Sequence, residues 1–161
     1  MIAPTGSGKT LAAFLSALDR LTTAPRPAEA AERCRVIYVS PLKALAVDIE
    51  RNLRAPLAGI RHAAQRIGAA TTDVNIAMRT GDTPADERRA FAKHSADILI
   101  TTPESWDRRR TSQARDRRGN VDTGIVDEVH AIAGTKRGAH LALTLERLDA
   151  RLAKPVQRIG L

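Results

Sequence analysis

Cysteine and aromatic residues are scarce in this sequence. Cys34 is the single cysteine among 161 residues, so the chain cannot form an internal disulfide, and we expect a reducing compartment in which this thiol packs at the start of a strand. Aromatic residues make up only 2% of the chain, which argues against the base-stacking surface that many single-strand binders use. His62, His94 and His140 have no cysteine at metal-ligand spacing, so we do not expect a zinc site.

Long apolar runs are also missing. No uninterrupted apolar stretch approaches the roughly 18 residues that a membrane span requires, and a glycine-rich segment stands where a signal peptide would be. We therefore expect a cytoplasmic protein without a membrane partner. Acidic residues are outnumbered, since 26 Lys and Arg against 18 Asp and Glu give a net charge of +8, and this excess favours a polyanionic partner.

The patterns that are present alternate between helix and strand, in a chain long enough for one domain. Apolar residues at helical spacing predict helices over residues 11–21, 42–53 and 141–152, and we expect Pro56 to interrupt the second. Short β-branched runs predict buried strands over 35–40, 74–80 and 97–102 and within 121–130. Thr83 and Pro84 give a further helix start signal. This alternation predicts an α/β domain whose mainly parallel sheet has helices on both faces.

A glycine-rich segment, "APTGSGKT", precedes the first expected helix. In such a segment glycines let backbone amides approach phosphate oxygens, a lysine neutralises the β and γ phosphates, and a hydroxyl ligates magnesium. Ala3 stands where the general pattern has its first glycine. We interpret the segment as a nucleotide-phosphate loop, the alternative being a glycine-rich turn without a ligand. The expected binding residues are Thr5, Gly6, Ser7, Gly8, Lys9 and Thr10, with Thr10 also a magnesium ligand.

Two acidic residues, Asp127 and Glu128, follow the apolar run in "IVDEVH". A carboxylate at the end of a strand can hold magnesium through water, and its neighbour can orient or deprotonate an attacking water. Acidic residues in this place can also merely cap the next turn. Because both motifs emerge at the carboxyl edge of a parallel sheet, we expect Lys9 and Asp127 to lie close together and to bind ATP with Mg²⁺.

Seven segments together carry a family resemblance. In chain order they are "APTGSGKT", "SPLKALAVD", "RTGDTP", "TTPES", "DEVH", "GTKRGAHLALTLERL" and "QRIGL". The set resembles the first motor domain of superfamily 2 helicases of the DEAD/DEAH-box type, and it is most similar to the bacterial large helicase-related (Lhr-like) family. The resemblance implies a RecA-like domain that binds ATP and single-stranded or partly duplex nucleic acid, and that acts with a second RecA-like domain to move along a strand.

The resemblance also implies roles for single residues. Lys9 and Thr10 bind phosphate and magnesium, Asp127 binds the magnesium, Glu128 activates water, and His130 couples hydrolysis to movement. For His130 the alternative is a solvated residue beyond a strand. Lys9, Asp127, Glu128 and His130 are thus the expected catalytic residues.

Three further loops are implied to touch the nucleic-acid backbone. Small hydroxyls, backbone amides and basic side chains at strand ends suit phosphates without reading bases. The residues concerned are Pro41, Leu42, Lys43, Arg79, Gly81, Thr101, Thr102 and Pro103. One alternative is open, because Arg79 can instead pair with Asp82 on the surface.

Some positions depart from the pattern. Residues 107–120 hold six arginines and two aspartates with Ala114 as their only apolar residue, where the resembled family has a helix with an apolar face. A solvated loop, a basic nucleic-acid patch and a local frame error in a decaying gene are the interpretations. Gly124 should weaken its strand by about 0.5–1 kcal/mol. Trp106 either packs a helix against the sheet or stacks on a base, and we favour packing.

The ends of the chain also depart from the family, which has more residues before the phosphate loop, Ser-Ala-Thr after the position of Leu161, and a second motor domain. We therefore expect residues 1–161 to form a partial first RecA-like domain, truncated at both ends, that binds ATP weakly and does not unwind nucleic acid alone. A separately encoded second half would be its partner. The alternatives are a noncatalytic basic nucleic-acid-binding module, a decayed helicase remnant, and a different phosphate-loop enzyme such as a small-molecule kinase.

Overall fold

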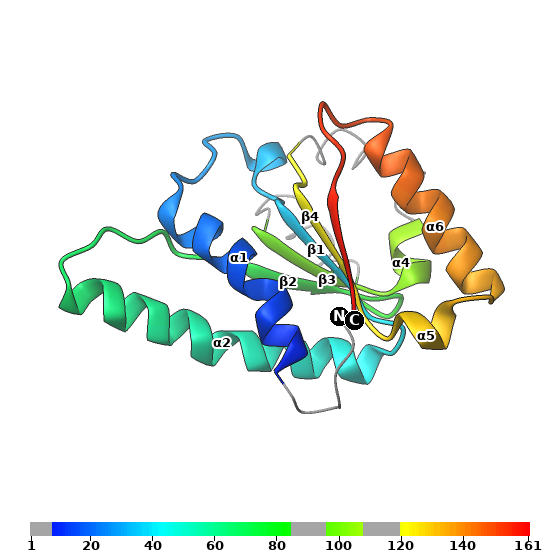
Figure 1. The fold of residues 1–161 in the computed structure, drawn as a ribbon, viewed down its shortest axis with the longest axis horizontal. Coiled ribbons are helices and arrows are strands. Elements are labelled where there is room, and N and C mark those ends of the chain that lie inside the picture. Colours follow the sequence, from blue (N-terminus) through cyan, green and yellow to red (C-terminus); the bar gives the residue numbers. More distant parts are fainter. Residues whose placement is uncertain (1–7, 85–95, 108–119) are drawn as a thin grey trace.

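A five-stranded sheet forms the centre of the molecule in the computed structural model, which describes residues 8–84, 96–107 and 120–161 (Figure 1). The strands are β1 (Val36–Val39), β2 (Ile76–Arg79), β3 (Ile98–Thr101), β4 (Thr123–Val126) and β5 (Gln157–Gly160), in the order β2-β3-β1-β4-β5. Every pairing in this sheet is parallel. The carboxyl ends of the strands therefore share one edge, as the alternating pattern predicted.

Helices cover both faces of the sheet (Figure 1). On one face lie α1 (Lys9–Thr23) and α2 (Lys43–Arg66). On the other lie α4 (Pro103–Asp107), α5 (Val129–Ile132) and α6 (Lys136–Asp149), and the short 3-10 helix η1 (Ala30–Glu32) precedes β1. In the described part of the chain, no helix combines the length and apolarity needed to cross a bilayer.

Strand β1 divides its side chains between two apolar cores, because alternate residues of a strand face opposite sides. Val36 and Tyr38 belong to the core beneath α1 and α2. Ile37 and Val39 belong to the core beneath α6. Trp106 joins the second core with 2% of its surface exposed, so the packing role predicted for it is confirmed.

The four strands predicted from β-branched runs are confirmed, but two details of the sheet differ. β2 was expected to be buried, and its residues are only half-buried, because within the described sheet it pairs with β3 alone. The fifth strand, β5, was not among the predicted strands, because its exposed Gln157 and Arg158 hide the apolar alternation that marks an internal strand.

The interruption expected at Pro56 is wrong. α2 runs from Lys43 to Arg66 with Pro56 inside it. Proline lacks the amide that would bond the carbonyl of Asn52, but Asn52 is exposed, where water can satisfy that carbonyl. Leu53 and Leu57 pack against the first core on either side, and this burial holds the helix together across the proline.

Gly124 has a packing reason that its sequence context did not reveal. It lies in β4 opposite Ile37 of β1 and Arg158 of β5. A Cβ atom at this position would lie 3.3 Å from Cγ1 of Val156, which is tighter than ordinary van der Waals contact. The close approach of Val156 therefore favours glycine inside this strand.

Some predictions fall on residues that the structure does not describe. They include the helix expected after Pro84, within 85–95, and nearly all of the arginine-rich segment, at 108–119. The interpretations offered for that segment stay open.

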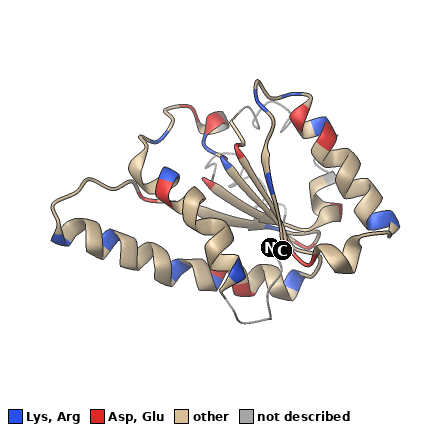
Figure 2. Ribbon diagram, viewed as in Figure 1, with Lys and Arg blue, Asp and Glu red and all other residues tan. Residues whose placement is uncertain are grey.

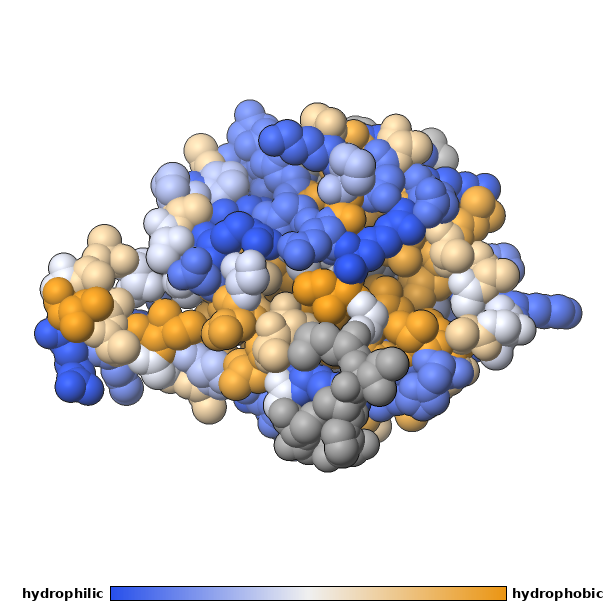
Figure 3. All heavy atoms as spheres, in the orientation of Figure 1, coloured by the Kyte–Doolittle hydropathy of each residue, from blue (hydrophilic) through white to orange (hydrophobic). Residues whose placement is uncertain are grey.

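Helix α1 buries only part of its apolar stripe. Phe14 and Leu18 are fully buried, whereas Leu11 and Leu15 are 46% and 61% exposed. Figure 3 shows apolar side chains gathered on the face that carries α1 and α2. The exposed surface of this face is therefore more apolar than that of two helices with polar outer sides.

Candidate functional site

Two cavities open at the carboxyl edge of the sheet, where the strands converge in Figure 1. The first has a volume of about 490 Å³ and lies between the start of α1, the side of α2 and the residues after β4. The second has a volume of about 350 Å³ and lies among the loops that follow β1, β2 and β3. Most of the described residues that the sequence singled out line one of these cavities.

The first cavity brings together two motifs that are far apart in the sequence. Gly8, Lys9 and Thr10 line it from the start of α1, and Asp127 and Glu128 line it from the end of β4. His130 also lines it. The parallel sheet thus unites the phosphate-loop end and the acidic pair, as expected; Thr5, Gly6 and Ser7 lie outside the described residues.

The start of α1 is suited to an anion. Gly8 caps the helix with a φ of 81°, a left-handed conformation that glycine adopts without strain. Within residues 8–84, 96–107 and 120–161, no side chain caps the helix, and its first turn holds no acidic residue. The first amides of a helix have no partner within the helix, and they lie at the positive end of its dipole, so phosphate oxygens fit here.

Asp127 is held by two donors. Its Oδ1 accepts a hydrogen bond from the backbone amide of Glu128 at 2.9 Å, and its Oδ2 accepts one from the hydroxyl of Tyr38. Its own amide donates to the carbonyl of Val39 at 2.9 Å, which continues the ladder beyond the end of β4. The carboxylate is therefore held in place in the wall of the first cavity.

Tyr38 is a residue that the sequence reasoning missed. It is fully buried in β1, and its ring stacks on Phe14 of α1 with centroids 5.4 Å apart. Burial, the hydrogen bond to Asp127 and the nearby negative charges of Asp127 and Glu128 raise the pKa of Tyr38 far above its ordinary value, so the hydroxyl stays protonated and donates. The signal in the sequence was a lone tyrosine in an otherwise aliphatic strand.

Glu128 has an unusual backbone conformation. Its φ of 50° and ψ of 45° are left-handed, which costs a residue with a side chain about 1–3 kcal/mol. The conformation turns the chain sharply from β4 into α5. His130 Nε2 then lies 3.2 Å from Glu128 Oε2, although 80% of the His130 side chain is exposed. Both roles offered for His130 remain compatible with this position.

The donor set of the first cavity fits a magnesium nucleotide. Lys9 and the amides of α1 offer positive charge to phosphates, while Asp127 and the Thr10 hydroxyl offer oxygen ligands to a hard cation. Among the described residues, no cluster of three or more His, Cys, Asp or Glu side chains forms a metal site. Magnesium commonly binds through one or two carboxylates together with substrate phosphates, and this arrangement matches that mode.

The second cavity is lined by four of the residues implied to touch nucleic acid, together with four that the sequence reasoning did not select. The first group is Pro41, Lys43, Gly81 and Thr102, and the second is Thr80, Asp82, Glu104 and Ser105. The remaining implied residues, Leu42, Arg79, Thr101 and Pro103, do not line it.

Two of those remaining residues lie in contrasting places. Leu42 is 57% exposed beside the cavity, and Thr101 is buried with 1% exposure. The Thr101 hydroxyl donates to the carbonyl of Arg79 at 2.8 Å, so it joins β3 to β2. This hydrogen bond gives Thr101 a role within the sheet, whereas its neighbour Thr102 lines the second cavity.

Charged groups of opposite sign meet across the second cavity. Lys43 Nζ lies 2.8 Å from Asp82 Oδ2, and both side chains are more than half exposed. The hydrogen bond from Lys43, with its positive charge, holds the pKa of Asp82 below its ordinary value. Asp82, which the sequence offered as a surface partner for Arg79, therefore forms its ion pair with Lys43.

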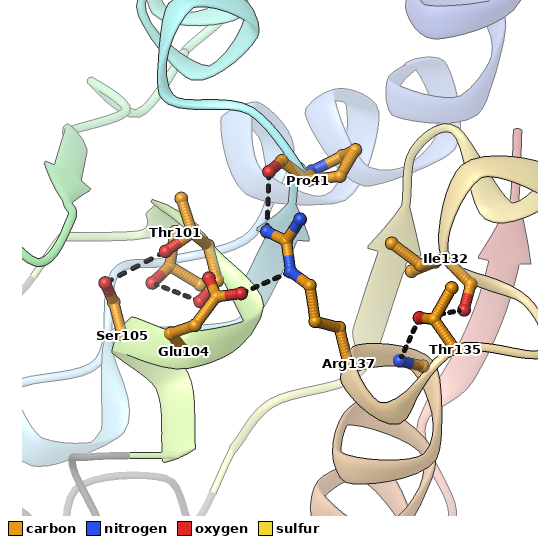
Figure 4. Close-up of polar contacts among 9 residues, drawn as sticks. Pro41, Thr101, Glu104, Ser105, Ile132, Thr135 and Arg137 are labelled. Carbon is orange, nitrogen blue, oxygen red and sulfur yellow. Dashed lines mark hydrogen bonds and ion pairs between the residues drawn. The ribbon is translucent and has the colours of Figure 1, made fainter.

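An arginine of α6 reaches toward the second cavity (Figure 4). Arg137 donates from Nη2 to the carbonyl of Pro41 at 2.8 Å and from Nε to the carboxylate of Glu104. Close by, the hydroxyls of Thr102 and Ser105 are hydrogen bonded at 2.9 Å. Arg137 thus connects the loop after β1 with α4.

Comparisons with known proteins find relatives that match the whole chain. The sequence model of the family described as DEAD/DEAH box helicase matches residues 1–161. The Lhr helicase/probable uracil glycosylase of Mycolicibacterium smegmatis is 59% identical over 161 residues, which are 100% of this chain and 11% of that protein. The Lhr helicase/uracil glycosylase of Escherichia coli is 54% identical over 165 residues, again 100% of this chain and 11% of the relative.

One solved structure matches closely. It is the Mycobacterium smegmatis helicase Lhr bound to ssDNA and AMP-PNP, with a TM-score of 0.91 and 58% identity over 99% of this chain and 20% of that one. The RecA-like fold predicted from the sequence is therefore confirmed. The chain spans 11% of the length of the two curated relatives.

Proposed function

The chain belongs to the DEAD/DEAH box helicase family, and from this premise we propose that it is part of a first RecA-like motor domain that binds ATP with Mg²⁺ in the first cavity and single-stranded nucleic acid at the second. One observation carries the proposal: the start of α1, with the left-handed Gly8 as its cap, and the Asp127–Glu128 pair line the same cavity. The solved relative is described as bound to ssDNA and AMP-PNP, which supports both ligands.

The residues of the two motifs in the first cavity have proposed parts in binding or proton transfer. The amide groups at the start of α1 and the ammonium of Lys9 bind the phosphates. Thr10 and Asp127 hold the magnesium ion, which neutralises charge on the phosphates when bound. Glu128 orients a water for attack and accepts its proton, and His130 contacts the Glu128 carboxylate.

At the second cavity the proposed contacts are to phosphates rather than bases. Lys43 provides a positive charge, and Thr102 provides a hydroxyl that already bonds Ser105. Arg79 and the Gly81 turn lie at the end of the neighbouring strand. Contacts of this kind are independent of base sequence and sensitive to salt, so we expect binding that weakens steeply as the ionic strength rises.

The activity of a whole helicase is a further step of the proposal. We expect a second RecA-like half to close over the first cavity and to convert closure into movement along the strand. Residues 1–161 alone should therefore bind ATP weakly, turn it over negligibly and separate no strands. Cys34 is a free, buried thiol. We therefore still expect a reducing compartment, the cytoplasm.

The test is magnesium-dependent binding of a fluorescent ATP analogue to the purified chain, with far-UV circular dichroism to establish that it is folded. Lys9→Ala should abolish saturable binding. Lys154→Ala is the matched control, because it removes the same charge from an exposed position in the turn before β5. A folded chain that shows no saturable binding, or equal loss in both variants, would contradict the proposal.

A second candidate is a noncatalytic module that binds nucleic acid through charge alone. The net charge of +8 favours it, and Figure 2 shows basic residues spaced along α2. All of these are exposed: Lys43, Arg51, Arg54, Arg61 and Arg66. Its signature would be salt-dependent oligonucleotide binding together with no nucleotide binding.

A further inference from the structure

The segment "GTKRG" at the start of α6 belongs to the family resemblance but received no role from it. Its backbone is tightly fixed. The Thr135 hydroxyl donates to the carbonyl of Ile132 at 2.7 Å and accepts from the amide of Gly138 at 3.1 Å. A Cβ at Gly138 would lie 2.2 Å from the Ile132 carbonyl oxygen, so only glycine allows this approach. Arg137 directly precedes Gly138, so its backbone position is fixed by these contacts.

The Arg137 side chain joins two segments that are distant in the sequence. Its Nη2 donates to the partly buried carbonyl of Pro41, and its Nε donates to Glu104 (Figure 4). Burial alone would raise the pKa of Glu104, but hydrogen bonds from Arg137, the backbone and Thr102, together with the charge of Arg137, hold that pKa below its ordinary value. Glu104 is thus an ionised acceptor near neutral pH.

Arg137 stands behind the second cavity rather than in it. Pro41 and Glu104 both line the cavity, and Arg137 does not. The positive charge of the Arg137 guanidinium also offsets the negative charge of the Glu104 carboxylate. Without Arg137, this carboxylate would repel a phosphate from the cavity wall. Arg137 bonds the carboxylate and the carbonyl from two separate nitrogens of one planar group, a spacing that the single ammonium nitrogen of a lysine does not reproduce.

We propose that Arg137 is a positioning residue that holds the Pro41 loop and α4 in register, so that Lys43 and Thr102 present one phosphate-binding surface. The inference rests on the nucleic-acid role proposed for the second cavity. Arg137 acts through Pro41 and Glu104 and makes no contact with the nucleic acid itself.

The experiment measures fluorescence anisotropy of a labelled single-stranded oligo-dT at several salt concentrations. Arg137→Gln should weaken binding about tenfold, since it removes two hydrogen bonds of which one is to a charged group. Arg147→Gln is the matched control, because it removes the same charge from an exposed position on the same helix. The dependence of affinity on salt should be the same in the two variants, because neither residue touches a phosphate.

Arg137→Lys separates positioning from direct contact. The lysine keeps the charge but has one donor nitrogen in place of the two that reach Pro41 and Glu104, so binding should stay as weak as in Arg137→Gln. Rescue by lysine, or a shallower salt dependence in Arg137→Gln than in Arg147→Gln, would show a direct phosphate contact and overturn the inference.

Amide hydrogen exchange gives a readout that does not need nucleic acid. Residues 42–45 and 104–107 should exchange faster in Arg137→Gln and in Arg137→Lys, with β1 and β3 unchanged. Unaltered exchange at both segments would overturn the inference. If neither the wild-type chain nor Arg147→Gln binds the oligonucleotide, the proposed function fails and the inference falls with it; if both bind and Arg137→Gln binds equally well, only the inference fails.

Discussion

The two cavities lie at the same edge of the sheet, but different contacts hold them. The first is built mainly from backbone geometry: the left-handed Gly8 before α1, and the turn at Glu128 after β4. The second depends on side chains that join separate segments, above all Lys43 with Asp82 and Arg137 with Glu104. Ligand binding at a cavity fixed by backbone geometry should tolerate substitutions of surface side chains. Binding at a cavity fixed by exposed side-chain pairs should weaken when either member of a pair is replaced.

The largest expected effect tests whether the cavities bind independently. Asp127→Asn should weaken magnesium-dependent binding of the ATP analogue about a hundredfold, equivalent to ~2.7 kcal/mol, because it removes the charged ligand for the cation. Oligonucleotide binding without nucleotide should be unchanged. The control is Asp73→Asn, whose side chain is 82% exposed. An equal loss of both activities would mean that the cavities do not bind separately.

The next effect breaks the second cavity through the backbone. Gly138→Ala should lower the free energy of unfolding by about 2 kcal/mol, since the added methyl group meets the Ile132 carbonyl and must displace the start of α6. Urea unfolding measures this change. Gly59→Ala in α2 is the matched control, because nothing lies within 4 Å of its Cβ, and it should stabilise the chain by about 0.5–1 kcal/mol. Equal effects of the two substitutions would contradict the close approach.

A smaller effect sharpens the description of the first cavity. Tyr38→Phe removes the hydroxyl that bonds Asp127 and keeps the ring that stacks on Phe14. We expect a loss of about 1 kcal/mol in stability and analogue binding weakened about threefold to fivefold, since the carboxylate loses one of its donors. Urea unfolding and a magnesium titration give the two values. Unchanged magnesium dependence would show that the amide of Glu128 suffices to hold Asp127.

The smallest effect concerns pH and the second cavity. The folded-state pKa of Glu104 lies below its ordinary value, so its pairing with Arg137 stabilises the fold above the unfolded-state pKa and is lost as the pH falls through the folded one. Because both side chains are nearly half exposed, the contribution should be about 0.5 kcal/mol or less. Urea unfolding of wild type and Glu104→Gln should differ by this amount at pH 7 and converge as the pH falls below the folded-state pKa of Glu104. If the difference in unfolding free energy between the two proteins does not change with pH, the Glu104–Arg137 pair is not its cause.

The sequence predicted the first cavity better than the second for a physical reason. Lys9 and Asp127 each follow from a local motif, and parallel strands then bring their ends together. Arg137 lies far along the chain from Pro41, and no periodicity indicates that an arginine on one helix will bond a loop carbonyl on another. Tyr38 was missed similarly, because a strand pattern tells which face a residue takes but not which acceptor its hydroxyl meets.

Within the fold, errors arose where tertiary contacts outweighed local preference. Pro56 stays inside α2 because the helix is held by apolar contacts on both sides of it. β5 was not expected because an exposed edge strand carries charged residues such as Arg158. Gly124 looked unfavourable until the position of Val156 was known. Each case required knowledge of a neighbour distant in the sequence.

One continuous segment, 127–137, begins at the first cavity with Asp127 and ends with Arg137, which bonds Pro41 and Glu104 of the second. It consists of the short helix α5, the turn after it and the capped start of α6. A change in the position of one end should therefore move the other end. In terms of thermodynamic linkage, a nucleotide that favours one position of this segment would change the affinity for nucleic acid, and nucleic acid would change the affinity for nucleotide by the same factor. The affinity for nucleotide can be measured with and without nucleic acid, and the affinity for nucleic acid with and without nucleotide. Both comparisons should give the same coupling free energy.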